Sequence, residues 1–102
     1  MAALDVTTLT VQPAGWNQMV ENHKKAKVIL EKHGARNVRL LAPVAGAQPA
    51  GTVPVVWEAD DLAALGKIMD PIFADPEILA IMQSSADTTS WTSSILGDLP
   101  MP

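Results

Sequence analysis

His23 is the residue of this sequence with the best prospects for chemistry. At about 100° per residue, a helical reading places it in an apolar stripe with Trp16, Met19 and Leu30. A histidine in such surroundings could act as a general base or bind an acidic group of a ligand, because burial and neighbours set its pKa. The alternative is a structural histidine that hydrogen-bonds to a strand or a loop.

The second histidine, His33, precedes Gly34 at the expected end of the same helix, where the dipole favours a cation, so we interpret it as part of the cap. His23 and His33 are about three helical turns apart, which is too far for both to bind one metal ion. The chain has no cysteine, so disulfides and thiolate sites are excluded. We predict no metal site.

Three carboxylates, Glu58, Asp60 and Asp61, cluster where a strand is expected to run into a helix. Paired carboxylates can share a proton and work as acid and base. Capping of the helix start and solvation explain the same residues, and this is the reading that we favour.

Lys27 lies one helical turn after His23 and could neutralise a carboxylate or phenolate group of a ligand. The alternative is that it extends along the helix edge into solvent. The hydroxyl-rich stretch between Ser84 and Ser94 shows no Ser-His-Asp arrangement, and the chain has no glycine-rich phosphate loop.

The elements that must position these residues follow from the hydrophobic pattern. Residues 4–12 predict a strand whose apolar parity shifts halfway, which indicates either a bulge near Thr7 and Thr8 or burial on both faces. The pattern then predicts a helix over 16–33 that ends at Gly34, followed by a hairpin of strands over 36–45 and 52–58. A second helix is capped by Asp60 or Asp61 and is kinked or ended at Pro71. A short helix capped by Asp75 and a strand over 88–96 complete the chain.

This β-α-β-β-α-β order is the split βαβ pattern of ferredoxin-like α+β domains, with a four-stranded antiparallel sheet and helices on one face. We expect a single domain over 1–102. The strands carry apolar residues on both faces, so the face without helices needs a cover. We therefore predict a homodimer in which a second copy packs on it.

Composition excludes several classes of protein. Of the 102 residues, 48% are hydrophobic and 18% are charged, which is typical of a chain that folds around a core. The net charge of −4 and the absence of a large basic cluster argue against nucleic acid as a partner. Neither a membrane-spanning stretch nor a signal peptide is visible, so we expect a cytoplasmic protein that does not bind membranes.

The order and spacing of these elements resemble the dimeric α+β barrel superfamily, which includes NIPSNAP proteins and antibiotic-biosynthesis monooxygenases. The residues that carry the likeness are Trp16 at the start of the long helix, the helix exit over 30–35, and the strand-to-helix passage over 55–62. The resemblance implies a ligand pocket between the helices and the sheet of each subunit. Its bulky lining candidates are Trp16, Met19, His23, Trp57, Met69, Phe73 and Trp91.

Trp57, followed by Glu58, resembles the tryptophan on the third strand of haem-degrading members of this superfamily. Those members also need a histidine ligand for the haem on the following helix. Residues 75–83 contain no histidine, and the chain has no tyrosine for a phenol-based oxygenase mechanism. We therefore predict no cofactor. Core packing remains the alternative for Trp57 and Trp91.

The first functional hypothesis is a dimeric barrel that binds an apolar or aromatic small molecule, with cofactor-independent monooxygenase, cyclase or isomerase chemistry in which His23 is the acid/base. The rivals are a non-catalytic module that binds a ligand or a partner, and a purely structural dimer. A cavity on the order of several hundred Å³ with converging polar groups favours the first. A filled interface between helices and sheet favours the others.

Overall fold

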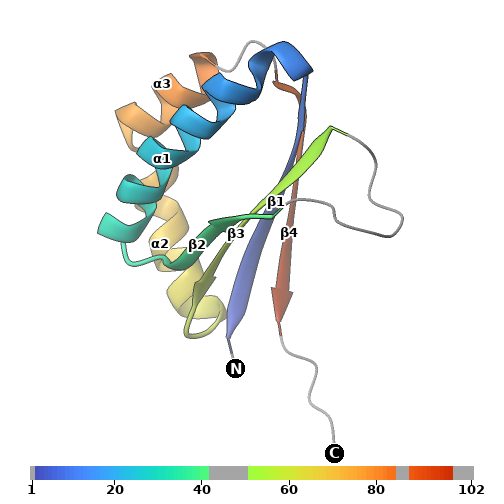
Figure 1. Cartoon of the computed structure of the whole chain (residues 1–102). Coiled ribbons are helices and arrows are strands. Elements are labelled where there is room, and N and C mark those ends of the chain that lie inside the picture. Colours follow the sequence, from blue (N-terminus) through green and yellow to red (C-terminus); the bar gives the residue numbers. More distant parts are fainter. Residues whose placement is uncertain (1, 42–50, 85–87, 98–102) are drawn as a thin grey trace, which may run out of the picture.

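The structure is a computed structural model that describes residues 2–41, 51–84 and 88–97, of which 83, 84 and 88–91 by their backbone alone. Its elements are, in chain order, β1 (Ala3–Val11), the short 3-10 helix η1 (Pro13–Gly15), α1 (Trp16–Lys32), β2 (Arg36–Leu40), β3 (Thr52–Ala59), α2 (Leu62–Phe73), α3 (Pro76–Ser84) and β4 (Thr88–Gly97) (Figure 1). The predicted β-α-β-β-α-β order is confirmed, with the second helical region divided into α2 and α3.

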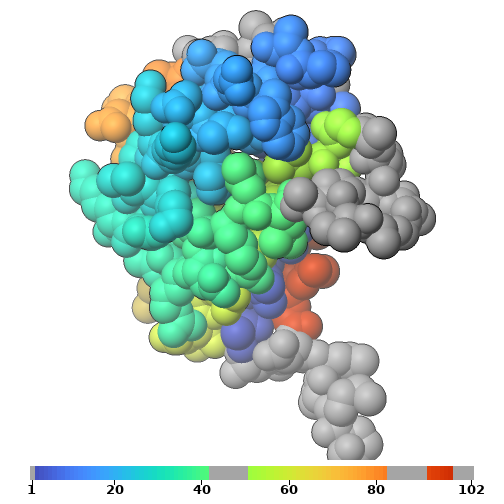
Figure 2. All heavy atoms as spheres, viewed as in Figure 1, coloured from blue at the N-terminus to red at the C-terminus, as the bar shows by residue number. Residues whose placement is uncertain are grey.

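The four strands form one antiparallel sheet in the order β2-β3-β1-β4, so β1 and β3 are central. The helices lie on one face of this sheet (Figure 1). This is the predicted α+β ferredoxin-like arrangement. From the side seen in Figure 2, α1 and β2 pack together and cover the interior.

Strand β1 has no bulge at Thr7 and Thr8. Its pairing runs without interruption past Thr7 and Thr8, and the only shift in the described register lies between Thr10 and Val11, against β4. The bulge at Thr7 and Thr8 is therefore wrong, and burial on both faces stays a prediction, because Leu4 and Val6 on the face away from the helices are only half-buried. Alternate residues from Ala3 to Val11 face the helices, and this set includes Asp5, Thr7 and Leu9.

Helix α1 ends as its sequence predicts. Gly34 has a φ of 104°, in the left-handed region that favours glycine. The amide of Gly34 donates to the Glu31 carbonyl and the amide of Ala35 donates to the Leu30 carbonyl, both at 3.0 Å. These two bonds form a Schellman motif, which fixes the direction in which the chain enters β2.

The second half of the chain begins its helices at aspartates. Asp61 accepts a hydrogen bond from the amide of Ala64 at 2.8 Å at the start of α2, and Asp75 accepts one from the amide of Glu77 at 2.9 Å at the start of α3. Pro71 lies in the last turn of α2, which continues to Phe73 before it ends. In the described part of the chain, no helix has the length and apolar character needed to span a bilayer.

The hydrophobic core has two parts. The larger cluster joins α1, α2 and α3 to one end of the sheet, and its most deeply buried residue is Leu65 at 1% exposure. The smaller cluster consists of Val11, Met19 and Val53, with partly buried neighbours. The residues that line the space between the two clusters form the candidate site.

Candidate functional site

A cavity of about 380 Å³ lies between the helices and the helix-facing side of the sheet. Most of its lining is apolar and comes from β1, β3 and all three helices of the described chain: Leu9, Met19, Ala26, Leu30, Val55, Trp57, Met69, Ile72, Phe73, Ile78, Ile81 and Met82. The polar lining residues are Asp5, Thr7, Asn22, His23 and Ser93. This volume is within the usual range for small-molecule pockets.

The cavity exists because short side chains stand where a filled core would need long ones. Thr7 on β1 and Ser93 on β4 are direct neighbours in the sheet, and Ala26 is on the facing helix α1. Larger residues on either side belong to the two core clusters. The interface between helices and sheet is therefore not filled.

Five of the predicted site residues line this cavity: Met19, His23, Trp57, Met69 and Phe73. Two do not. Trp16 is 47% exposed outside the cavity, and Lys27 is exposed and pairs with Glu31 on the same helix. The reason is the rotation of α1, whose inward side includes Met19, Asn22 and Ala26, so that Trp16 and Lys27 fall on its edge. The side chain of Trp91 lies outside the described residues, although its backbone pairs with Leu9.

Asp5 is the functional candidate that sequence reasoning missed. Its side chain lines the cavity from the central strand β1, and the residue is only 4% exposed. Burial raises the pKa of the Asp5 carboxyl, and a hydrogen bond from Thr7 opposes this shift in part. The signal was the parity shift in β1, because Asp5 and Thr7 occupy positions of the helix-facing side that an ordinary core would fill with apolar residues.

A chain of hydroxyl groups leads to this carboxyl. The Thr7 hydroxyl donates to Asp5 Oδ1 at 2.9 Å, and Thr7 Oγ1 lies 3.0 Å from Ser93 Oγ. A hydroxyl has one proton to donate, so with Thr7 donating to Asp5, the Ser93 hydroxyl must donate to Thr7. The hydrogen bonds therefore run from exposed Ser93 on β4 to the buried acid on β1.

His23 lines the cavity from α1 and is half-buried. Burial lowers the pKa of its imidazole, and the positive charge of Lys27 lowers it further. A neutral imidazole can accept a proton, as a general base must. Next to it, Asn22 is 7% exposed and its Oδ1 accepts a hydrogen bond from Gln18 Nε2 at 2.9 Å, so a second polar group of α1 is held at the cavity wall.

His33 has a structural position. It is the C-cap residue of α1, and its Nε2 lies 3.2 Å from Asp75 Oδ2. This hydrogen bond is the main cause of the lowered pKa of the Asp75 carboxyl. The contact joins the end of α1 to the start of α3, which supports the reading of His33 as part of a cap.

The carboxylate cluster forms no acid/base pair either. Asp61 caps α2, and Asp60 pairs with Arg36 at 2.7 Å.

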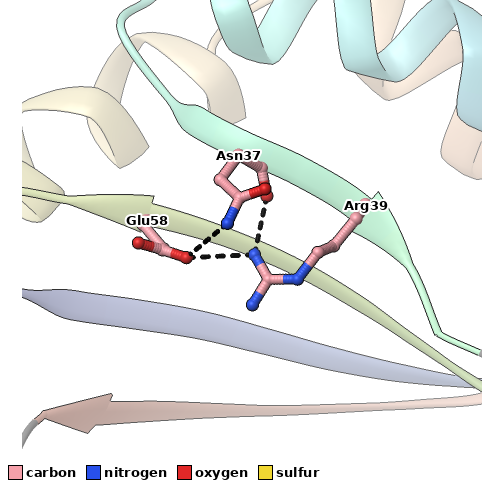
Figure 3. A network of polar contacts seen from close by, with 3 residues as sticks. All are labelled: Asn37, Arg39 and Glu58. Atoms are coloured by element: carbon pink, nitrogen blue, oxygen red, sulfur yellow. Dashed lines mark hydrogen bonds and ion pairs between the residues drawn. The ribbon is translucent and has the colours of Figure 1, made fainter.

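Figure 3 shows the third member of that cluster, Glu58, whose Oε2 accepts from Asn37 Nδ2 at 2.8 Å and from Arg39 at 3.0 Å. These bonds lower the pKa of Glu58, the one from Asn37 most. Asn37 has a φ of 52°, and the register of β2 against β3 shifts between Arg36 and Arg39. The network therefore supports a bulged strand. Among the described residues, no cluster of three or more His, Asp or Glu side chains could hold a metal ion.

Solved structures with the same architecture cover nearly all of the chain. An uncharacterized NIPSNAP domain protein from Burkholderia xenovorans is 16% identical, with a TM-score of 0.73 over 95% of this chain and 94% of its own. SnoaB, a cofactor-independent oxygenase from Streptomyces nogalater, is 12% identical, with a TM-score of 0.70 over 98% of this chain and 95% of its own. An antibiotic biosynthesis monooxygenase is 13% identical, with a TM-score of 0.69 over 98% and 100%.

No protein-family model and no curated protein sequence matches the chain. The chain nevertheless has the fold of the dimeric α+β barrel superfamily, in the form seen in NIPSNAP domains and antibiotic biosynthesis monooxygenases. The predicted resemblance is confirmed. The likeness concerns the fold, and a shared fold does not define a ligand or a reaction.

Proposed function

We propose that the protein binds an apolar or aromatic small molecule in the cavity between its helices and its sheet. The observation that carries this proposal is the cavity of about 380 Å³, whose lining is mostly apolar with polar groups at a few positions. Such a lining excludes water from most of a ligand and orients it through a few hydrogen bonds. Trp57 offers an indole surface for stacking on an aromatic ring.

The proposal extends to cofactor-independent chemistry in which His23 is the acid/base. Two observations support it: the position of His23 at the cavity wall, where burial lowers its pKa, and a fold shared with SnoaB, a cofactor-independent oxygenase. Purely structural packing would leave no reason for an unfilled interior. A non-catalytic binding module remains the rival, and the behaviour of His23 variants separates the two.

Binding is tested with N-phenyl-1-naphthylamine, an uncharged aromatic probe whose fluorescence rises in apolar surroundings. We expect saturable binding that Ala26→Phe weakens by about tenfold or more, because the new ring fills the cavity. Ala63→Phe, on an exposed position of α2, is the matched control and should bind like the wild type. Equal binding to the Ala26→Phe variant would place the probe elsewhere and contradict the proposal.

We also propose that residues 1–102 form one domain that works as a cytoplasmic homodimer, without nucleic acid or membrane as partner. The face of the sheet away from the helices supports the dimer, because Leu4, Val6 and Leu96 lie side by side on it. Leu96 is 52% exposed. The structures with the same fold are of the dimeric barrel kind.

A further inference from the structure

We propose that Asp5 is the second catalytic residue of the cavity and works with His23 on an uncharged, largely apolar carbonyl compound. His23 takes a proton from the carbon next to the carbonyl group, and Asp5 donates a hydrogen bond to the carbonyl oxygen. The inference rests on the proposed function, because it requires a small molecule in the cavity.

The position of Asp5 gives the first argument. An aspartate at 4% exposure on the central strand, facing an apolar cavity, costs folding free energy. Its presence there points to a functional use of the carboxyl. Directly opposite on β3 is Trp57, and on β4 Ile95. Neither neighbour carries a charge that would hold the carboxylate in its ionised form. Burial therefore favours the neutral acid, whose pKa is raised.

The hydroxyl chain gives the second argument, because Thr7 engages only Oδ1 of the carboxyl. Asp5 Oδ1 accepts from Thr7, as the carbonyl oxygen of a neutral carboxylic acid does. In the neutral acid that we propose, Oδ2 then carries the proton. A carboxylic acid with Oδ1 held in this way can offer the O–H of Oδ2 to a ligand, and such a donor stabilises negative charge on a carbonyl oxygen.

The charges around the cavity define the ligand. Of the described residues that line it, His23 is the only titratable group besides Asp5, and none is lysine or arginine. A carboxylate or phosphate on the ligand would have no cation to pair with in this lining. An uncharged molecule with a carbonyl oxygen fits both the apolar walls and the donor on Asp5.

The reaction balances without any other reactant. The imidazole of His23 accepts the proton, the electrons of the C–H bond form a carbon–carbon double bond, and the carbonyl π electrons move to the oxygen. Asp5 stabilises that oxygen by its hydrogen bond. The imidazolium then returns a proton to the same carbon or to a conjugated one, which exchanges or isomerises the substrate and restores both residues.

The test uses 2-tetralone, an uncharged bicyclic ketone, dissolved with the full-length protein in deuterated buffer. Loss of the proton signal at the carbon between the carbonyl and the ring, followed by NMR, measures proton abstraction against a protein-free blank. Binding is measured separately from the quenching of tryptophan fluorescence. We expect the wild type to accelerate exchange by about 100-fold or more.

The variants assign the roles. His23→Gln should lower exchange to the blank rate, and Asp5→Leu should lower it by about 100-fold, while both bind 2-tetralone within a few-fold of the wild type. Asp5→Asn keeps an N–H donor and should retain more exchange than Asp5→Leu. Asp70→Asn, on an exposed position of α2, is the control and should behave like the wild type.

The pH profile gives a readout that a structural role for Asp5 would not move. Exchange in the wild type should follow a bell-shaped pH profile. The Asp5→Leu variant should lose the alkaline side of that profile, because one of the two titrating groups is gone. Binding without accelerated exchange, or exchange that survives Asp5→Leu, overturns this inference and leaves the proposed function standing. Absence of both 2-tetralone and N-phenyl-1-naphthylamine binding contradicts the proposed function itself.

Discussion

Asp5 and Trp57 lie directly opposite each other on β1 and β3, so a buried carboxyl and an indole share one wall of the same cavity. In a filled core, a residue facing the helices from a central strand would be apolar. The pair therefore marks the place where the interior of this fold is not closely packed.

Replacement of Asp5 by leucine should stabilise the protein at neutral pH by about 1 kcal/mol, because a buried carboxyl is exchanged for a side chain that prefers the interior. The folded pKa of Asp5 is raised above 3.8. Wild-type stability should therefore fall, relative to the variant, as the pH rises from 3.8 through the folded pKa. Urea unfolding at several pH values, at one protein concentration, measures both effects. A variant that is less stable at every pH would show that Asp5 supports the fold.

His23→Ala should weaken ligand binding or proton exchange by about tenfold or more, or about 1.4 kcal/mol, and leave stability nearly unchanged, because a residue at a cavity wall has few packing partners to lose. A core histidine would behave in the opposite way, with unaltered binding and a loss of roughly 1–3 kcal/mol in stability. Chemical denaturation at fixed protein concentration, together with the binding titration, distinguishes these cases.

The stability of His23→Ala relative to the wild type should depend on pH with a sign that follows from the pKa of His23. Burial lowers the folded pKa of His23 below 6.5, so as the pH falls through 6.5 the unfolded chain takes up a proton before the folded protein does. His23 should therefore destabilise the wild type in weak acid. The stability of His23→Ala relative to the wild type should rise as the pH is lowered from 7 to 5, and a constant difference would refute the assignment.

Haem should not bind as a catalytic substrate, because residues 75–83 provide no histidine ligand. Titration with haemin should produce no stoichiometric shift of the Soret band, and a reductant in air should not bleach it. A one-to-one complex that is degraded would contradict this prediction and would point to His23 as the axial ligand.

The homodimer can be tested with two neighbouring residues on opposite faces of β4. Leu96 pairs with Leu4 on the face away from the helices, and Ile95 pairs with Asp5 on the helix-facing side. Their exposed fractions are nearly equal, 52% and 50%. Sedimentation should show a dimer for the wild type and for Ile95→Glu, and a monomer for Leu96→Glu. A wild type that stays monomeric at 100 µM would mean that the sheet face tolerates water.

The sequence predicted the elements well because their ends carry strong local signals. Gly34, Asp61 and Asp75 each stop or start a helix through a bond that depends on the residue itself, and the structure contains all three bonds. Local chemistry of this kind needs no knowledge of the remainder of the chain.

The candidate site was harder to predict because it depends on rotation and register. A small error in the facing direction of α1 moved Trp16 and Lys27 into the expected pocket and left Asn22 out of it. Asp5 was overlooked because its partners, Trp57 and Ile95, are brought near it only by the pairing of β1 with β3 and β4. Such neighbours follow from tertiary structure.

The alternation of side chains along β1 places two sets of residues on opposite faces of the sheet. Its even positions, Leu4, Val6 and Thr8, face away from the helices, and its odd positions, Asp5, Thr7 and Leu9, face the cavity. Under the proposed roles, substitutions at the odd positions can change the ligand that the protein binds without changing its dimer interface. The residues that control these two properties are adjacent in the sequence. A saturation scan of this strand should accordingly show tolerance that alternates with a period of two, with ligand-dependent and assembly-dependent defects on successive residues.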